Sequence, residues 1–217
     1  MVFVIILISG IPVTIPNTVL RLDNLTIRDA VTSTCHTVAG LYYFGGNMLE
    51  YKKIAVIGCS GGGKSTFSKQ LAEITGLPLY HLDNIYWQPD TSHLKRHVFI
   101  KKQKEIMKND SWIIDGNYGG TMKYRIKKCE LLYFFDIPTE VCIEGVLNRD
   151  RKREDIACEL EPNDELLDFI KAYREHSRPR VLKLIGEYPD KKVITFKSHK
   201  EVNEYLEGLR SCYGLNV

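Results

Sequence analysis

The sequence predicts an α/β fold, a three-layer α/β/α sandwich around a five-stranded parallel sheet. From Met48 onward, short runs of β-branched and apolar residues alternate with segments whose apolar residues recur every three or four positions. This alternation is typical of parallel strands joined by crossover helices, because each crossover returns the chain to the same end of the sheet. The 217 residues, 44% of them apolar, suffice for one such domain.

Five apolar runs are the expected strands. The first, KIAVIG, has the continuous apolar character of a buried parallel strand. The expected strands cover Lys53–Gly58, Leu79–Leu82, Trp112–Ile114, Leu131–Phe135 and Lys192–Phe196.

Amphipathic segments follow these runs. One helix begins at Lys64 and ends before Gly76, a second covers about residues 92–108, and a third follows Pro138. A fourth runs from Asp164 until Pro179 interrupts it, and a fifth closes the chain. The apolar residues expected to face the core are Phe67, Leu71, Ile74, Val141, Val146, Leu147, Leu166, Ile170, Tyr173, Val202, Tyr205, Leu206 and Leu209.

The first 47 residues differ from the rest of the chain. They carry only four charged side chains and no sustained helical or strand period. The segment Gly45-Gly46-Asn47-Met48 is what a purine-rich GGAGG ribosome site would spell if it were translated in frame, so we predict that Met48 is the native initiator. The expected division is then an N-terminal extension over residues 1–47 and a functional domain over residues 48–217. The alternative is a genuine flexible arm.

Composition narrows the class of protein. The 30 Lys and Arg against 27 Asp and Glu leave a net charge of +3, too small to imply wholesale binding to nucleic acid or membrane. The six cysteines include no C-x-x-C pair, which fits reduced thiols in a cytoplasm. The apolar run Val2 to Ile8 is far shorter than the roughly 20 residues of a membrane-spanning helix. We expect a cytoplasmic protein with no membrane partner.

A glycine-rich motif joins the first strand to the first helix. The segment GCSGGGKS matches G-x-x-x-x-G-K-S/T, a P-loop, whose backbone N–H groups wrap a diphosphate. Lys64 places a charge on the outer phosphates, Ser65 offers a hydroxyl to Mg²⁺, and Thr66 reaches the next phosphate inward. A turn built only for tight packing is the alternative. The predicted ligand is ATP with Mg²⁺, held by Gly58, Cys59, Ser60, Gly61, Gly62, Gly63, Lys64, Ser65 and Thr66.

Two single residues in this region have open roles. Cys59 is either a redox-sensitive thiol or simply a small residue in the loop. Asp115 ends the third strand, at the edge where a parallel sheet presents its ligands, and is placed to hold the Mg²⁺ shell through water. An Asp before a Gly is also a common turn pair.

The segment W-I-I-D-G-N-Y resembles the hydrophobic-hydrophobic-D-G signature of nucleoside monophosphate kinases, with Asn117-Tyr118 in place of their Pro-Arg. From about Lys53 to Leu209 the chain is more similar to the DNA topology modulation protein family, adenylate-kinase-like P-loop proteins. The motifs that carry this resemblance are GCSGGGKST, HLDNIYWQP at 81–89, IDGNY at 114–118 and SRPR at 177–180. The resemblance implies a P-loop NTPase fold of the nucleoside monophosphate kinase type with a short lid, and an ATP-using phosphotransferase whose acceptor is poorly defined.

An acceptor site is expected beside the P-loop. Asp83 ends the second strand, where it could orient an attacking hydroxyl or accept its proton, and Trp87 follows within a turn. A capping role for Asp83 and a packing role for Trp87 are equally open.

Arginines are expected around the moving phosphoryl group, because phosphoryl transfer needs positive charge there. Arg149, Arg151 and Arg153 follow the fourth crossover helix, where adenylate-kinase-like enzymes carry a lid. Arg149 is assigned to the base or phosphates, and Arg151 and Arg153 to phosphate charge. Arg125 and Arg174 are candidates for clamping an anionic acceptor. A solvated helix face is the alternative for such charges.

We therefore predict an ATP-dependent kinase of a nucleotide or small-molecule acceptor, acting as a monomer or homodimer. Its expected catalytic residues are Lys64, Asp83, Asp115, Arg151 and Arg153. The alternative is an ATP-dependent regulatory protein that affects DNA topology without kinase turnover. Direct DNA binding is not favoured, because the charge is near neutral and no helix-turn-helix or zinc finger is present. The choice between ATP and GTP stays open.

Overall fold

The computed structural model describes residues 3–8, 11–16, 51–90, 92–148 and 163–215. The chain divides into two compact units, one spanning Gly46–Leu206 and one formed by Met1–Gly45 with Glu207–Val217. In the latter, strands β1 (Phe3–Ile8) and β2 (Ile11–Pro16) form an antiparallel hairpin. The domain boundary at Met48 and the start of translation there stay predictions.

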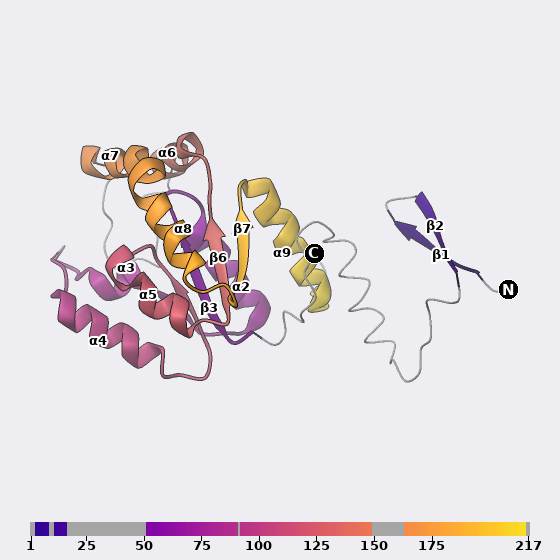
Figure 1. Cartoon of the computed structure of the whole chain (residues 1–217), viewed down its shortest axis with the longest axis horizontal. Coiled ribbons are helices and arrows are strands. Elements are labelled where there is room, and N and C mark those ends of the chain that lie inside the picture. Colours follow the sequence, from indigo (N-terminus) through magenta and orange to yellow (C-terminus); the bar gives the residue numbers. More distant parts are fainter. Residues whose placement is uncertain (1–2, 9–10, 17–50, 91, 149–162, 216–217) are drawn as a thin grey trace. The chain divides into compact units, whose positions relative to one another are not determined.

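The unit that spans Gly46–Leu206 is built on a five-stranded sheet (Figure 1). All neighbouring strands are parallel, in the order β4-β5-β3-β6-β7. The strands are β3 (Lys53–Gly58), β4 (Leu79–His81), β5 (Trp112–Asp115), β6 (Leu131–Phe135) and β7 (Lys192–Phe196). The predicted α/β fold with a five-stranded parallel sheet is therefore confirmed.

Helices and one π-helical turn, η3, alternate with these strands. They are α2 (Lys64–Thr75), α3 (Leu82–Tyr86), α4 (Arg96–Ile106), α5 (Gly119–Lys128), α6 (Thr139–Leu147), α7 (Asp164–Ala172), η3 (Tyr173–Ser177), α8 (Arg178–Gly186) and α9 (His199–Cys212). Among the described residues, none of these helices combines the length and the apolar character needed to cross a bilayer.

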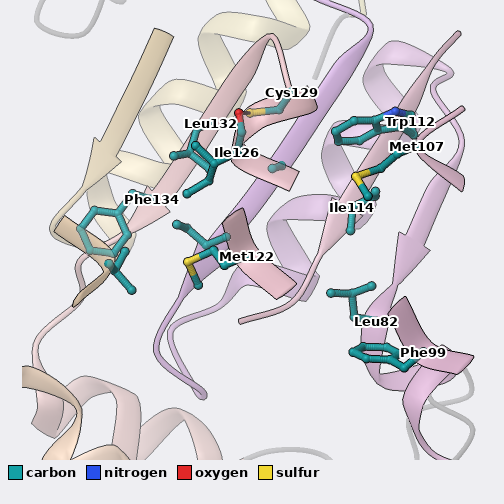
Figure 2. Close-up of a cluster of buried hydrophobic side chains, with 13 residues drawn as sticks. Leu82, Phe99, Met107, Trp112, Ile114, Met122, Ile126, Cys129, Leu132 and Phe134 are labelled. Carbon is teal, nitrogen blue, oxygen red and sulfur yellow. Dashed lines mark hydrogen bonds between the residues drawn. The ribbon is translucent and has the colours of Figure 1, made fainter. Parts of the chain in front are cut away.

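Alternate residues of the central strands pack on opposite faces of the sheet, as the two-residue period of a strand requires. On one face, Leu132 and Phe134 of β6 belong to a buried cluster with residues of α4, α5 and α8. Figure 2 shows this cluster, in which Trp112 lies against Met107 and Leu82 lies against the ring of Phe99. On the other face, Phe67 of α2 packs edge-on against the rings of Tyr133 and Phe135. The sheet is thus covered on both faces, which gives the three layers.

Several predicted elements have different limits in the structure. The second strand ends at His81, and Leu82 begins the short helix α3. The predicted helix over residues 92–108 is α4, which covers only Arg96–Ile106. Leu147, expected to face inward, is 59% exposed, and Cys142 occupies the buried face of α6 beside Val146. Helix α5 was not predicted, because its sequence GGTMKYRIKK begins with two glycines and offers few apolar positions.

The expected break at Pro179 is absent, because the chain continues from α7 through η3 into α8. Pro179 lies in the first turn of α8, where a missing backbone N–H is tolerated. The π turn contributes one extra residue per turn relative to an α-helix, and such turns are often found at functional sites.

Candidate phosphoryl-transfer site

The P-loop joins the carboxyl end of β3 to the first turn of α2. Gly58, Gly61 and Gly63 have φ angles of 142°, 79° and 89°, a region that side-chain-bearing residues rarely adopt. A Cβ on Gly61 would stand 1.9 Å from the carbonyl oxygen of Cys142, and one on Gly58 would stand 2.4 Å from that of Phe135. The glycines therefore meet both a conformational and a steric requirement, and they leave the N–H groups of the loop and of α2 available to phosphate oxygens.

Lys64 is the first residue of α2, and its side chain is buried at the loop. Its Nζ donates a hydrogen bond of 2.7 Å to the carbonyl oxygen of Cys59. The ammonium group is thereby held across the loop that would surround the phosphates. A bound phosphate oxygen can replace this carbonyl as its acceptor.

Asp115 ends β5 beside the P-loop, because Asp115 pairs in register with Val56 of β3. Its Oδ2 lies 2.9 Å from Nδ1 of His81, the last residue of β4. Burial by itself raises the pKa of this carboxyl group, but hydrogen bonds with His81 and Ser65 and the charge of Lys64 outweigh it and hold the pKa below its ordinary value. Asp115 is therefore ionised at neutral pH.

The residues at this edge fit a Mg²⁺ ion that arrives with a nucleotide. No cluster of three or more His, Cys, Asp or Glu side chains suited to a metal occurs in the part of the chain that the structure describes. Nucleotide-bound Mg²⁺ needs no such cluster, because phosphate oxygens and waters supply most of its ligands. The second carboxylate oxygen of Asp115, Oδ1, is buried and has no hydrogen-bond partner among the described residues. Ser65 and Asp115 together offer the oxygen ligands that the ion prefers.

Asp83 lies in the first turn of α3 rather than at the end of a strand. Its Oδ1 accepts a hydrogen bond of 2.7 Å from the hydroxyl of Tyr118. Burial, followed by the nearby charge of Asp83, raises the pKa of Tyr118, so its hydroxyl stays protonated and donates. The carboxylate of Asp83 is thus held in a fixed orientation.

Aromatic rings cluster about Tyr118, the hydrogen-bond partner of this carboxylate. Tyr86 packs against Trp87 and Tyr118 at ring-centroid distances of 5.1 Å each, and it stacks on His93 at 5.0 Å. Trp87, which was expected to line the acceptor site, is partly exposed at the end of α3. Gly119, the first residue of α5, is exposed, and an added Cβ there would meet no neighbouring atom within 4 Å.

Arg125 is not placed to clamp an anionic acceptor, which corrects the prediction. It is fully buried, and its guanidinium donates to Gln103 Oε1 at 2.9 Å, to Thr121 Oγ1 at 2.8 Å and to the carbonyl of Gly116 at 2.9 Å. Burial lowers its pKa to about 10. Arg125 instead braces the backbone that follows Asp115, a role that its spacing from the Asp-Gly turn did not reveal.

Arg174 and Arg178 lie four residues apart across η3 and share one partner, Asp136. Arg178 binds Asp136 through two parallel hydrogen bonds of 2.6 and 2.7 Å, and Arg174 Nη1 lies 4.0 Å from Oδ1 of the same carboxylate. Asp136 directly follows β6, and Phe135 is the register partner of Gly58. Two guanidinium groups on one carboxylate therefore leave net positive charge close to the P-loop.

The remaining predicted site residues, Arg149, Arg151 and Arg153, lie outside the described residues. Three further groups at the site escaped the sequence analysis: His81 on Asp115, Tyr118 on Asp83, and Asp136 on Arg178. His81 and Tyr118 belong to the HLDNIYWQP and IDGNY segments, so those segments could have pointed to them. Asp136 had no such signal, because only the fold brings it to Arg178.

No protein-family model matches the chain, and no curated protein matches it. Several solved structures do match the chain. Shikimate kinase from Acinetobacter baumannii in complex with shikimate is 12% identical, with 73% of this chain and 90% of that chain covered and a TM-score of 0.50. Shikimate kinase from Bacteroides thetaiotaomicron is 16% identical over 76% and 99% of the two chains, with a TM-score of 0.49. A gluconokinase from Sinorhizobium meliloti 1021 is 15% identical over 75% and 94%, with a TM-score of 0.45.

At this level of identity the likeness shows the fold alone, which is that of P-loop kinases. Membership of the DNA topology modulation protein family stays a prediction, since no family model matches.

Proposed function

We propose that this chain is an ATP-dependent kinase that transfers the γ-phosphoryl group to a hydroxyl of a small-molecule acceptor. The observation that carries the proposal is the joint placement of two carboxylates at one edge of the sheet. Asp115 lies with Lys64 and Ser65 at the P-loop, and Asp83 lies in the first turn of α3, two residues after the end of β4, the strand next to β5. A carboxylate for the metal and a second for the acceptor are what phosphoryl transfer to a hydroxyl requires.

Each group then has a role. The P-loop N–H groups and Lys64 hold the phosphates, and Mg²⁺, when bound by Ser65 and through water by Asp115, neutralises their charge. Asp83, oriented by Tyr118, accepts the proton of the attacking hydroxyl or orients that hydroxyl. Arg174 and Arg178 supply positive charge beside the P-loop. Arg149, Arg151 and Arg153 remain candidates for further phosphate contacts.

The P-loop fold of the similar shikimate kinases and gluconokinase supports a kinase over a regulatory switch that does not turn over. The acceptor is not identified by these likenesses. ATP with Mg²⁺ is the proposed donor because the P-loop and Asp115 suit both.

A screen for ADP formation tests the proposal. The full chain is incubated with ATP, Mg²⁺ and a panel of hydroxyl-bearing nucleosides, nucleotides, sugars and hydroxy acids, with Lys64→Ala as the blank. For the acceptor that is found, Asp83→Asn should lower kcat by about 10²- to 10⁴-fold while the affinity for a fluorescent ATP analogue stays within about twofold of the original.

The matched control is Asp90→Asn, an exposed carboxylate seven residues along the chain that accepts hydrogen bonds from the backbone N–H and the hydroxyl of Ser92. Its turnover should be unchanged. The proposal is wrong if no acceptor raises ADP formation above the Lys64→Ala blank, or if Asp83→Asn turns over at the original rate.

A further inference from the structure

A histidine and the carboxylate of the proposed metal site face each other across two neighbouring strands. His81 ends β4 and Asp115 ends β5, and the two residues are partners in the register of these parallel strands. Nδ1 of His81 lies 2.9 Å from Oδ2 of Asp115, and the two side chains are only 10% and 5% exposed. An ionised carboxylate can only accept a hydrogen bond, so the Nδ1–H of His81 is the donor. The proposed function gives Asp115 a role at Mg²⁺ but gives His81 none.

This hydrogen bond occupies one oxygen of the carboxylate and leaves the other oxygen without a donor. Asp115 Oδ1 is buried and has no hydrogen-bond partner among the described residues. A buried oxygen in this state costs free energy, and a water molecule held by Mg²⁺ is a donor that would satisfy it. The χ2 torsion of an aspartate has only broad preferences. A hydrogen bond on Oδ2 is therefore needed to hold Oδ1 in one direction.

Packing fixes the backbone beside this pair independently of the hydrogen bond. Gly116 follows Asp115 with a φ of 146°, and a Cβ on it would stand 2.7 Å from the Cβ of Leu82, the residue after His81. The carbonyl oxygen of Gly116 also accepts a hydrogen bond of 2.9 Å from Arg125. The two backbone segments are thus in direct contact. The hydrogen bond between the side chains then sets the orientation of the carboxylate and not the position of its backbone.

The same two segments carry the carboxylate of the proposed acceptor site. Asp83 lies two residues after His81, and its Oδ1 accepts the hydrogen bond of 2.7 Å from Tyr118, which lies three residues after Asp115. Each carboxylate is therefore oriented by a residue of the other segment. The metal-site carboxylate and the acceptor-site carboxylate form one connected unit, in which His81 is the member that acts on the metal side.

We propose that His81 is a positioning residue for the Mg²⁺ site. Through its Nδ1–H it holds Asp115 so that Oδ1 can accept a hydrogen bond from a water molecule on the Mg²⁺ that arrives with the nucleotide. This inference rests on the proposed function, because it takes ATP with Mg²⁺ as the ligand of the P-loop. Removing a hydrogen-bond partner of a carboxylate at a metal site typically lowers the affinity for the metal by about 10- to 100-fold.

The test measures binding of a fluorescent ATP analogue to the full chain, first with excess EDTA and then over a series of Mg²⁺ concentrations. In His81→Ala, the Mg²⁺ concentration that gives half of the full effect on binding should rise at least about tenfold. The affinity for the analogue in EDTA should stay within about twofold of the original. Loss of a residue with a merely structural role would instead lower the affinity with and without Mg²⁺ alike.

Two further variants separate the hydrogen bond from the bulk of the ring. His81→Asn keeps an N–H donor near the position of Nδ1 and should bring the Mg²⁺ midpoint back to within about threefold of the original. His81→Gln carries its donor one bond farther, near the position of Nε2, and should behave like His81→Ala. Where His81→Ala fails to fold, the comparison of Asn with Gln decides. His97→Ala, which changes an exposed histidine of α4, is the matched control and should leave both measurements unchanged.

The inference is overturned if the Mg²⁺ midpoint of His81→Ala stays within about twofold of the original, if its affinity in EDTA falls as far as that with Mg²⁺, or if Gln restores the midpoint as well as Asn does. The measurement needs no acceptor, so it can fail separately from the kinase proposal. ADP formation with an unchanged midpoint in His81→Ala would contradict this inference alone. The expected midpoints without ADP formation in the acceptor screen would contradict the proposed function alone, and a chain that binds no analogue would contradict both.

Discussion

At the scale of single residues, the carboxylate of Asp136 organises the positive charge beside the P-loop. It is 7% exposed and takes two hydrogen bonds from Arg178, whose pKa it raises. In Asp136→Asn, Arg178 loses its charged partner and Arg174 loses its nearest carboxylate. We expect a loss of about 1–3 kcal/mol in the free energy of unfolding, measured by urea denaturation, because a largely buried, bidentate pair is broken while Arg178 keeps partial access to water.

The control for Asp136→Asn is Lys123→Ala, which removes the ion pair of 2.9 Å between Lys123 and Glu187. Both side chains of that pair are exposed, so its loss should leave the free energy of unfolding nearly unchanged. Equal losses in the two variants would mean that Asp136 is no more than an ordinary surface partner.

At the scale of elements, the P-loop depends on the contact between Gly61 and α6. Gly61→Ala combines a φ of 79° with a Cβ placed 1.9 Å from a backbone carbonyl oxygen. The loop has to move away from α6, so affinity for a fluorescent ATP analogue should fall by at least about tenfold.

Gly76→Ala separates the conformational cost from the steric cost. Gly76 caps α2 with a φ of 70°, but nothing lies within 4 Å of an added Cβ. This variant should lose about 1 kcal/mol of stability, lower the melting temperature by roughly 2–4 °C, and keep its nucleotide affinity. If both alanine variants bind the analogue equally well, the packing of Gly61 on α6 is not what shapes the loop.

The elements that the sequence predicted are those with strong local signals. The five strands carry continuous apolar runs, and α2 is framed by the P-loop and by Gly76 at its end. Helices α3 and α5 lacked such signals: α3 has only five residues, and α5 begins with Gly-Gly and ends with Lys-Lys. The prediction for Leu147 was wrong for a similar reason, because an apolar residue next to the buried Val146 can face either the core or the solvent.

The residues of the candidate site show the same difference between those with a local sequence signal and those without one. The P-loop glycines, Lys64 and Asp115 are specified by short contiguous motifs, so their chemistry could be read directly. Arg125 was misread, because its burial depends on Gln103 of α4, which only the fold brings to α5, as well as on Thr121 one turn earlier in its own helix. The contact of Gly61 with the carbonyl of Cys142 likewise depends on α6 lying against the loop, and no local pattern encodes it.

At the scale of the whole molecule, the Gly46–Leu206 unit contains the complete sheet, the P-loop and the residues around Asp83 and Asp115. If residues 1–47 are dispensable, a chain over residues 48–217 should keep the melting temperature within about 2 °C and the affinity for a fluorescent ATP analogue within about twofold, because no strand of the five-stranded sheet is removed. A chain that begins at Gly58 is the matched control. It lacks most of β3, the central strand between β5 and β6, and should not fold cooperatively. A large drop in melting temperature on removal of residues 1–47 alone would instead show that the N-terminal segment stabilises the kinase-like domain, and the boundary at Met48 would then be wrong.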